Sequence, residues 1–105
     1  MPGQRQDQTD GAVKERTSVQ KKTPKLYKVL LLNDDYSTMA FVVEVLEGVF
    51  QKSPAEAFRI MMLVHTQGRG LAGVYPLEIA ETKVETVTRL AKDAGFPLRA
   101  TLEPE

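Results

Sequence analysis

The chain has 105 residues, enough for one small domain, and its 42% hydrophobic content is ordinary for a globular protein. Its 14 basic and 14 acidic residues cancel, so we expect no nucleic-acid partner, and the lack of cysteine excludes disulfides and thiolate chemistry. No apolar run approaches the ~18 residues of a membrane span and no secretory signal is visible, so we expect no membrane partner and a cytoplasmic location.

Residues 1–24 differ in composition from the rest of the chain. Their only large apolar residues are Met1, Val13 and Val19, and five basic residues against three acidic ones give the segment a net charge of +2. A segment of this kind buries too little surface to offset the entropy of ordering it. We therefore expect a flexible N-terminal extension at 1–24 and one core domain at 25–105.

The core domain begins with a predicted strand over residues 26–32, because the sequence LYKVLLL is short, aliphatic and bounded by polar residues. The turn NDD follows. Apolar residues then recur at helical spacing, which predicts a helix over residues 38–50 with Ser37 or Thr38 as its N-cap.

The sequence SPAE predicts the start of a second helix. Ser53 suits the N-cap, Pro54 the first helical position, and Glu56 is placed to complete a capping box. We expect this helix to end at about residue 67, because Gly68 is typical of a helix C-terminus.

The last three predicted elements are a strand over residues 71–75, a helix from Pro76 to just before Gly95, and a strand over residues 97–102. A sheet of three strands is too small to bury the apolar stripes of helices on both of its faces, as a doubly wound fold requires. The order strand, helix, helix, strand, helix, strand therefore predicts an α+β fold, with a small three-stranded antiparallel sheet and three helices packed on one face.

Four polar residues flanked by apolar ones are the candidates for a functional site: Asn33, Asp34, Asp35 and His65. Their carboxylates, amide oxygen and imidazole nitrogen are hydrogen-bond acceptors, suited to an ammonium with several N–H donors. Apolar residues from the two neighbouring helices are placed to form a hollow beside them. A primary amine next to a bulky apolar group is the chemistry of the first residue of a polypeptide.

Other interpretations of these residues stay open. Asn33, Asp34 and Asp35 are also ordinary turn and capping residues, and His65 suits a helix end. A hydrolytic zinc site commonly uses more than one histidine, whereas this chain has one. No strained nucleophile and no phosphate-binding loop is visible, so we expect no enzymatic activity and no cofactor, with a small metal-dependent enzyme as a remaining alternative.

The stretches YKVLLLNDDYSTMAFVVEVL, VHTQGRGLAGVY and EIAETKV together resemble the ClpS family of bacterial adaptor proteins. The resemblance covers about residues 26–103 and implies the fold described above. It also implies a non-enzymatic function: binding proteins whose N-terminal residue is Leu, Phe, Tyr or Trp (N-degrons) and delivering them to the ClpA unfoldase of the ClpAP protease. A non-enzymatic interaction module of the same fold, without N-terminal residue recognition, is the alternative.

The resemblance also assigns roles to individual residues. The α-amino group would be held by Asn33, Asp34, Asp35 and His65, with Asp35 favoured over Asp34 as the closer carboxylate. The side-chain pocket would be formed by Ser37, Met39, Val42, Met61, Val64 and Leu98, with Met39 as a gate against β-branched residues. The surface that meets the N-terminal domain of the unfoldase would include Glu78, Glu81 and Lys83.

The sequence departs from the family at the start of the first predicted helix. Many members read NDDYTPMEF where this chain reads NDDYSTMAF, so Thr38 replaces a proline and Ala40 replaces a glutamate. Proline fixes a helical φ and glutamate completes a capping box, so both changes predict a looser first turn. We therefore expect a more mobile Met39 and an altered preference among Leu, Phe, Tyr and Trp.

Overall fold

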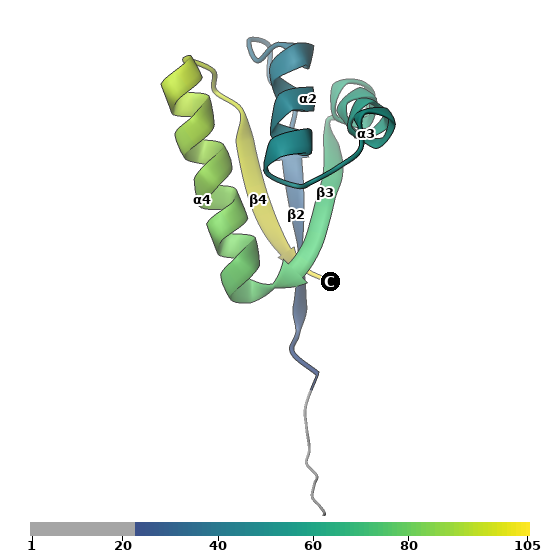
Figure 1. Ribbon diagram of the computed structural model, residues 1–105, viewed down its shortest axis with the longest axis vertical. Helices are drawn as coiled ribbons and strands as arrows, with labels where there is room; N and C mark the ends of the chain where they lie inside the picture. The colour runs from purple at the N-terminus through teal and green to yellow at the C-terminus, as the bar shows by residue number, and fades with distance from the viewer. Residues whose placement is uncertain (1–22) are drawn as a thin grey trace, which may run out of the picture.

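The computed structural model describes residues 23–105. The predicted extension at 1–24 lies outside the described residues except for Thr23 and Pro24, which are exposed and belong to no helix or strand. The elements follow one another in the order β2, α2, α3, β3, α4, β4 (Figure 1), which is the predicted strand and helix order.

The sheet has three strands, with β2 (Leu26–Leu32) in the centre between β3 (Arg69–Pro76) and β4 (Arg99–Pro104). Both pairings are antiparallel, as predicted. Val29 and Leu31 of β2 point into the core, whereas Leu30 lies on the opposite face of the sheet. The Arg69–Glu103 ion pair, 2.9 Å long, joins the two outer strands.

Three helices, α2 (Met39–Gly48), α3 (Pro54–Gln67) and α4 (Leu77–Ala94), cover one face of the sheet (Figure 1). Their apolar stripes meet Val29 and Leu31 in a single core cluster, and the most deeply buried helical residues include Leu46, Ile60 and Val87. The predicted α+β fold is therefore confirmed. None of the helices in residues 23–105 combines the length and apolar character needed to cross a bilayer.

The local signals in the sequence predicted β2 and α3 with their observed bounds. Ser53 caps α3 by accepting a hydrogen bond from the Glu56 N–H, and Gly68 ends it at a φ of 91°. The Glu56 carboxylate does not complete a capping box in return, because it pairs with Arg59 one turn later.

Several bounds of α2, β3, α4 and β4 differ from the predicted ones by one or two residues. Helix α2 ends at Gly48 rather than residue 50, and Gln51 in the following loop has a positive φ of 53°. Strand β3 begins at Arg69 because this residue pairs with Leu32 of β2. Strand β4 spans Arg99–Pro104 rather than 97–102, since its bounds also follow from pairing with β2.

A close approach between α3 and β3 depends on Gly70. A Cβ atom at this position would lie 2.9 Å from Val64 Cγ2 and 3.1 Å from the Ile60 carbonyl oxygen. Only glycine lets the helix pack this near to the strand. Gly70 therefore fixes the distance of α3, which carries Met61, Val64 and His65, from the sheet.

The two ends of β2 face opposite poles of the molecule. At the pole where the strand begins, the Glu105 N–H donates a 3.0 Å hydrogen bond to the Leu26 carbonyl oxygen, and Leu26 pairs with Pro76 just before α4. At the other pole Leu32 leads into the turn NDD, beside the first residues of α2 and the end of α3 (Figure 1).

Candidate functional site

A hollow of about 260 Å³ lies where β2 ends, between α2 and α3. Nine of the ten residues that sequence analysis assigned to the α-amino and side-chain sites line it: Asn33, Asp34, Asp35, Ser37, Met39, Val42, Met61, Val64 and His65. The polar residues come from the turn after β2 and from the last turn of α3. The apolar ones come from facing sides of the two helices.

Backbone hydrogen bonds hold the turn in place. The Asn33 N–H donates a 2.9 Å bond to the Gly68 carbonyl oxygen, which ties the end of β2 to the end of α3. Asp34 Oδ1 accepts bonds from the N–H groups of Tyr36 and Ser37, at 2.7 and 2.6 Å. Asp34 is therefore a turn residue, as the structural interpretation of this motif predicted.

The apolar wall has a deeply buried part and an open part. Val42, Met61 and Val64 are 3–6% exposed and belong to the core cluster, so they cannot move without disturbing the core. Met39, the first residue of α2, is 46% exposed and lies at the edge of the hollow. Its position at the helix start makes it the wall residue with the greatest freedom to change rotamer.

Thr38 is the N-cap of α2, and its hydroxyl accepts a 3.1 Å hydrogen bond from the Phe41 N–H. This resolves the choice between Ser37 and Thr38 that the sequence left open. It also places Ala40 at the second helical position, so a glutamate there would not form the predicted capping box. Thr38 therefore supplies a cap that proline at the same position lacks.

Two buried polar atoms of the turn have no hydrogen-bond partner in the described residues: Asp34 Oδ2 and Ser37 Oγ. Burial would raise the pKa of Asp34, but the Ser37 N–H, the nearby Ser37 hydroxyl and the Tyr36 N–H together lower it below its ordinary value of 3.8. The hydroxyl thus favours the ionised carboxylate without forming a well-aligned hydrogen bond. Buried polar atoms without partners are rare in folded proteins, and a bound donor would satisfy them.

Around these atoms the hollow gathers two carboxylates, an amide and an imidazole. Asn33, Asp35 and His65 are exposed, so their polar groups are accessible to a ligand. Acceptors of this kind suit a compact cation that donates several hydrogen bonds. Within residues 23–105, no three His, Cys, Asp or Glu side chains are placed to hold a metal ion.

Leu98 is the one pocket residue that does not line the hollow. It lies just before β4, is 3% exposed and belongs to the core cluster. A leucine at this point of the sequence suits both the core and the wall of the hollow. Only the packing of the sheet against the helices determines which of the two it occupies.

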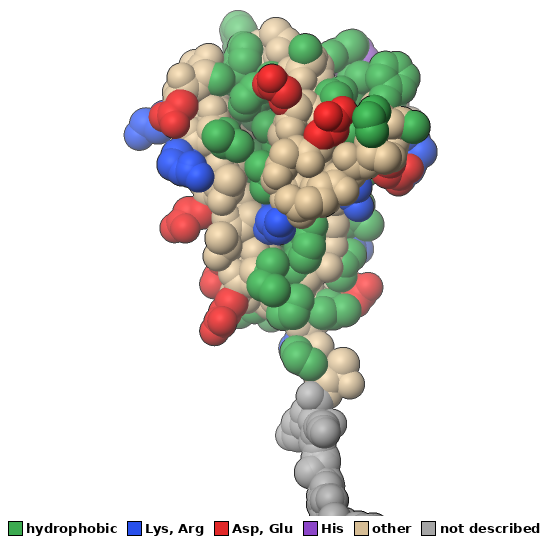
Figure 2. Space-filling model, viewed as in Figure 1, with side chains coloured by type: hydrophobic (Ala, Val, Ile, Leu, Met, Phe, Trp, Pro, Cys, Tyr) green, Lys and Arg blue, Asp and Glu red, His purple; other side chains and the backbone are tan. Residues whose placement is uncertain are grey.

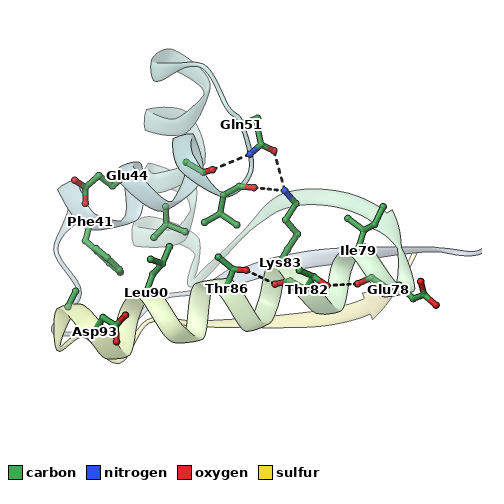
Figure 3. Close-up of a pocket in the computed structure, with 14 residues that line it drawn as sticks. Phe41, Glu44, Gln51, Glu78, Ile79, Thr82, Lys83, Thr86, Leu90 and Asp93 are labelled. Atoms are coloured by element: carbon green, nitrogen blue, oxygen red, sulfur yellow. Dashed lines mark hydrogen bonds between the residues drawn. The ribbon is translucent and has the colours of Figure 1, made fainter.

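The three residues assigned to a partner surface lie on α4, but they do not share one environment. Glu78 and Glu81 are exposed, whereas Lys83 is half-buried. The Lys83 ammonium donates to the Val49 carbonyl oxygen at 2.6 Å and to Gln51 Oε1 at 3.2 Å (Figure 3). Lys83 therefore joins α4 to the end of α2, a contact that spacing along the helix did not reveal.

A model of the family described as "ATP-dependent Clp protease adaptor protein ClpS" matches residues 22–101. An ATP-dependent Clp protease adapter protein ClpS from Acetivibrio thermocellus is 54% identical over 93 residues, covering 89% of this chain and 94% of that protein. The corresponding protein from Maricaulis maris is 52% identical over 102 residues, with coverages of 91% and 94%.

The fold is also similar to a solved structure, Agrobacterium tumefaciens ClpS2 bound to L-phenylalaninamide. The two chains are 51% identical, and the TM-score is 0.76. The match covers 79% of this chain and 100% of the other.

Proposed function

This chain belongs to the ClpS family of ATP-dependent Clp protease adaptor proteins, and we propose that it recognises the first residue of N-degron substrates. It binds their free α-amino group together with a bulky hydrophobic side chain (Leu, Phe, Tyr or Trp) and delivers them, in the cytoplasm, to the ClpA unfoldase. The observation that carries this proposal is the single hollow in which polar acceptors adjoin an apolar wall.

The polar side of the hollow holds the α-amino group. An α-amino group has an ordinary pKa of ~7.7–8.0 and is largely charged at neutral pH, and acceptors around it favour that form further. Asn33, Asp35 and His65 offer accessible polar groups, and Asp34 Oδ2 is a buried carboxylate oxygen without a partner. This unpaired oxygen makes Asp34 the stronger candidate, which reverses the ranking of the two carboxylates predicted from the sequence.

The apolar side holds the side chain of the same residue. The whole hollow, polar and apolar sides together, has a volume of about 260 Å³, below the ~300–1000 Å³ typical of a site for a drug-sized ligand, and suits a single amino-acid residue. Burying Leu or Phe there contributes roughly 1.5–3 kcal/mol before ordering costs. Phenylalaninamide, the ligand of the similar ClpS2 structure, combines a free amino group with such a side chain, which supports this division of the hollow.

Delivery requires a second surface, and we propose that α4 contributes to it. Glu78 and Glu81 are exposed and available to the N-terminal domain of the unfoldase. Lys83 already has internal partners, so we propose that it acts mainly by holding α4 against the end of α2.

The test is fluorescence anisotropy with a peptide that begins with Phe and its N-acetylated twin. We expect tight binding of the first and almost none of the second, because acetylation removes the charge and leaves buried acceptors unpaired. Asp34→Asn should weaken binding of the free peptide more than Asp35→Asn does, since it replaces the unpaired carboxylate oxygen with a donor. Equal binding of both peptides would instead indicate an interaction module without N-terminal recognition.

A further inference from the structure

A second, larger hollow lies outside the proposed peptide site. It is a groove of about 1020 Å³ between α2 and α4 (Figure 3), and we call it the α2–α4 groove. Phe41 and Val49 line it from α2 and its C-cap, and Ile79 and Leu90 line it from α4. Ile79 is 48% exposed, so apolar surface is left open to a binding partner.

The charges around the α2–α4 groove are mainly acidic. Glu44 and Asp93 lie at one end and Glu78 at the other (Figure 3). The one basic lining residue, Lys83, already donates to Val49 and Gln51, and its ammonium lies 5.4 Å from the centre of the Tyr75 ring. Figure 2 shows hydrophobic side chains between α2 and α4, with both acidic and basic side chains around them. The groove therefore suits a basic segment with a few apolar side chains.

We propose that residues 1–22 of this chain bind in the α2–α4 groove. The described part of the chain begins beside the entrance to it. Pro24, Lys25 and Tyr27 form a hollow of about 480 Å³ with the first residues of α4, and two of these, Glu78 and Ile79, also line the groove. A continuous surface thus leads from the point where residue 23 enters the domain into the groove.

Residues 1–22 are long enough to extend along the whole α2–α4 groove. From Glu78 to Ala94 the groove follows α4 for 16 residue steps, or ~24 Å at ~1.5 Å per residue. At ~3.3 Å per residue, about eight residues of chain span that distance, out of the 22 that precede the described part.

The composition of the segment complements the groove. Residues 1–22 carry five basic and three acidic residues, a net charge of +2, whereas three carboxylates and one ammonium line the groove. Val13 and Val19 supply apolar side chains, and Lys14 and Arg16 lie between them in the sequence. Attraction between such exposed charges is screened by salt, so the contact weakens as ionic strength rises.

The consequence goes beyond peptide recognition. A segment bound in the groove covers Glu78, which belongs to the surface we propose for the unfoldase. The segment and the unfoldase then compete for one end of α4. The intramolecular contact itself does not depend on whether the peptide site binds N-degrons, so the two proposals are tested separately.

The experiment is paramagnetic relaxation in the full 105-residue chain. The sequence has no cysteine, so Ser18→Cys provides a single site for a nitroxide label. We expect strong broadening of the Thr82 and Thr86 amide signals, which reduction of the label restores. The amide of Leu63 should change little, because it belongs to α3, which packs against α2 and β3 and lies on the other side of α2 from α4 (Figure 1).

Charge variants test where the segment binds. Glu44→Lys combined with Asp93→Lys should remove most of the broadening, because two of the three lining carboxylates become cations and repel a basic segment. Glu85→Lys is the matched control, since Glu85 lies on α4 but lines a different hollow, and this variant should leave the broadening in place.

Three results would overturn the proposal. Broadening distributed evenly over all faces would mean that the segment has no preferred site, and broadening centred on His65 would place it in the peptide hollow. The third result is binding between molecules, which is measured in a mixture of nitroxide-labelled chains and unlabelled, isotope-enriched chains. Equally strong broadening between different molecules would make the occupant a second copy of the chain.

Discussion

At the scale of single residues, Asp34 combines two tasks that usually fall to different side chains. One carboxylate oxygen holds the turn by accepting from Tyr36 and Ser37, and the other is buried without a partner at the proposed amine site. Hydrogen bonds that favour the ionised form outweigh the burial that opposes it, and so lower the pKa of Asp34. The residue is therefore negative at neutral pH before any ligand arrives.

The lowered pKa of Asp34 predicts a specific pH dependence of stability. Because the folded-state pKa lies below the unfolded value, the ionised carboxylate contributes stability above the ordinary value of 3.8, and this contribution is lost as the pH falls through the folded-state pKa. Asp34→Asn should reduce the free energy of unfolding at pH 7 by on the order of 1 kcal/mol. The difference from the parent protein should shrink at strongly acidic pH. Urea unfolding at the two pH values measures this, and an equal difference at both would contradict it.

Two glycines provide a matched test of packing. Gly70→Ala would force a Cβ to 2.9 Å from Val64 Cγ2, so we expect a loss of stability of roughly 1–3 kcal/mol and weaker peptide binding through displaced α3 residues. Gly48→Ala at the end of α2 meets no atom within 4 Å and should stabilise the protein by ~0.4–1 kcal/mol. Urea unfolding of both variants checks the pair. A Gly70→Ala protein as stable as its parent would show that α3 can shift away from β3 at no cost.

At the scale of elements, helix α2 links the proposed peptide site to α4. Its first residue, Met39, borders the hollow, and Lys83 of α4 donates to the carbonyl oxygen of its C-cap, Val49. A cation at the C-terminal end of a helix also interacts favourably with the helix dipole, whose negative end lies there. Both ends of α2 are therefore held by side-chain hydrogen bonds, from Thr38 at the start and Lys83 at the end.

The first turn of α2 is the place to test side-chain preference. Thr38→Pro removes the hydroxyl acceptor but suits the observed φ of −76°, and Ala40→Glu adds an acidic residue to a first turn that has none. We expect the double variant to hold Met39 more rigidly and to change the order of affinities for peptides beginning with Leu, Phe, Tyr and Trp. Anisotropy titrations with the four peptides measure the order. The same ranking before and after the substitutions would show that this turn does not set the preference.

Elements with strong local signals were predicted best from the sequence. Ser53, Pro54 and Gly68 determine the bounds of α3 through their own backbone preferences, and the aliphatic run of β2 needs no partner to be recognised. Strands β3 and β4 were displaced because pairing with β2 determines where an outer strand starts, and pairing is not local.

Most residues that line the candidate site were also predicted from the sequence. Nine of the assigned residues line one hollow because the motifs NDD and VH mark the ends of β2 and α3, which a hydrogen bond from Asn33 to Gly68 holds together. Leu98 does not line the hollow in this structure, and the sequence could not show this, since burial in the core and burial in a pocket wall require the same apolar residue. The α2–α4 groove was missed entirely, because it exists only once two helices far apart in the sequence lie side by side.

At the scale of the whole molecule, recognition and delivery are expected to depend on different parts of the chain. Deleting residues 1–20 should leave peptide affinity unchanged, since the residues that line the hollow in the described part of the chain all lie between 33 and 65. The same deletion frees the end of α4 for docking, but it should still impair degradation of an N-degron substrate by the assembled protease, because it shortens a segment of 24 residues that can reach up to roughly 80 Å toward an unfoldase. Anisotropy and a degradation assay on the same protein measure the two effects. Loss of peptide binding on deletion would show that the segment is part of the recognition domain.

The opposed poles of β2 have a practical consequence for such assays. Residue 105 is hydrogen-bonded to the first residue of β2, whereas the hollow lies beyond the last residue of this strand. Because β2 has seven residues at ~3.3 Å each, a tether at residue 105 lies about 20 Å or more from a bound peptide. Immobilising the protein through that residue leaves the hollow facing away from a sensor surface.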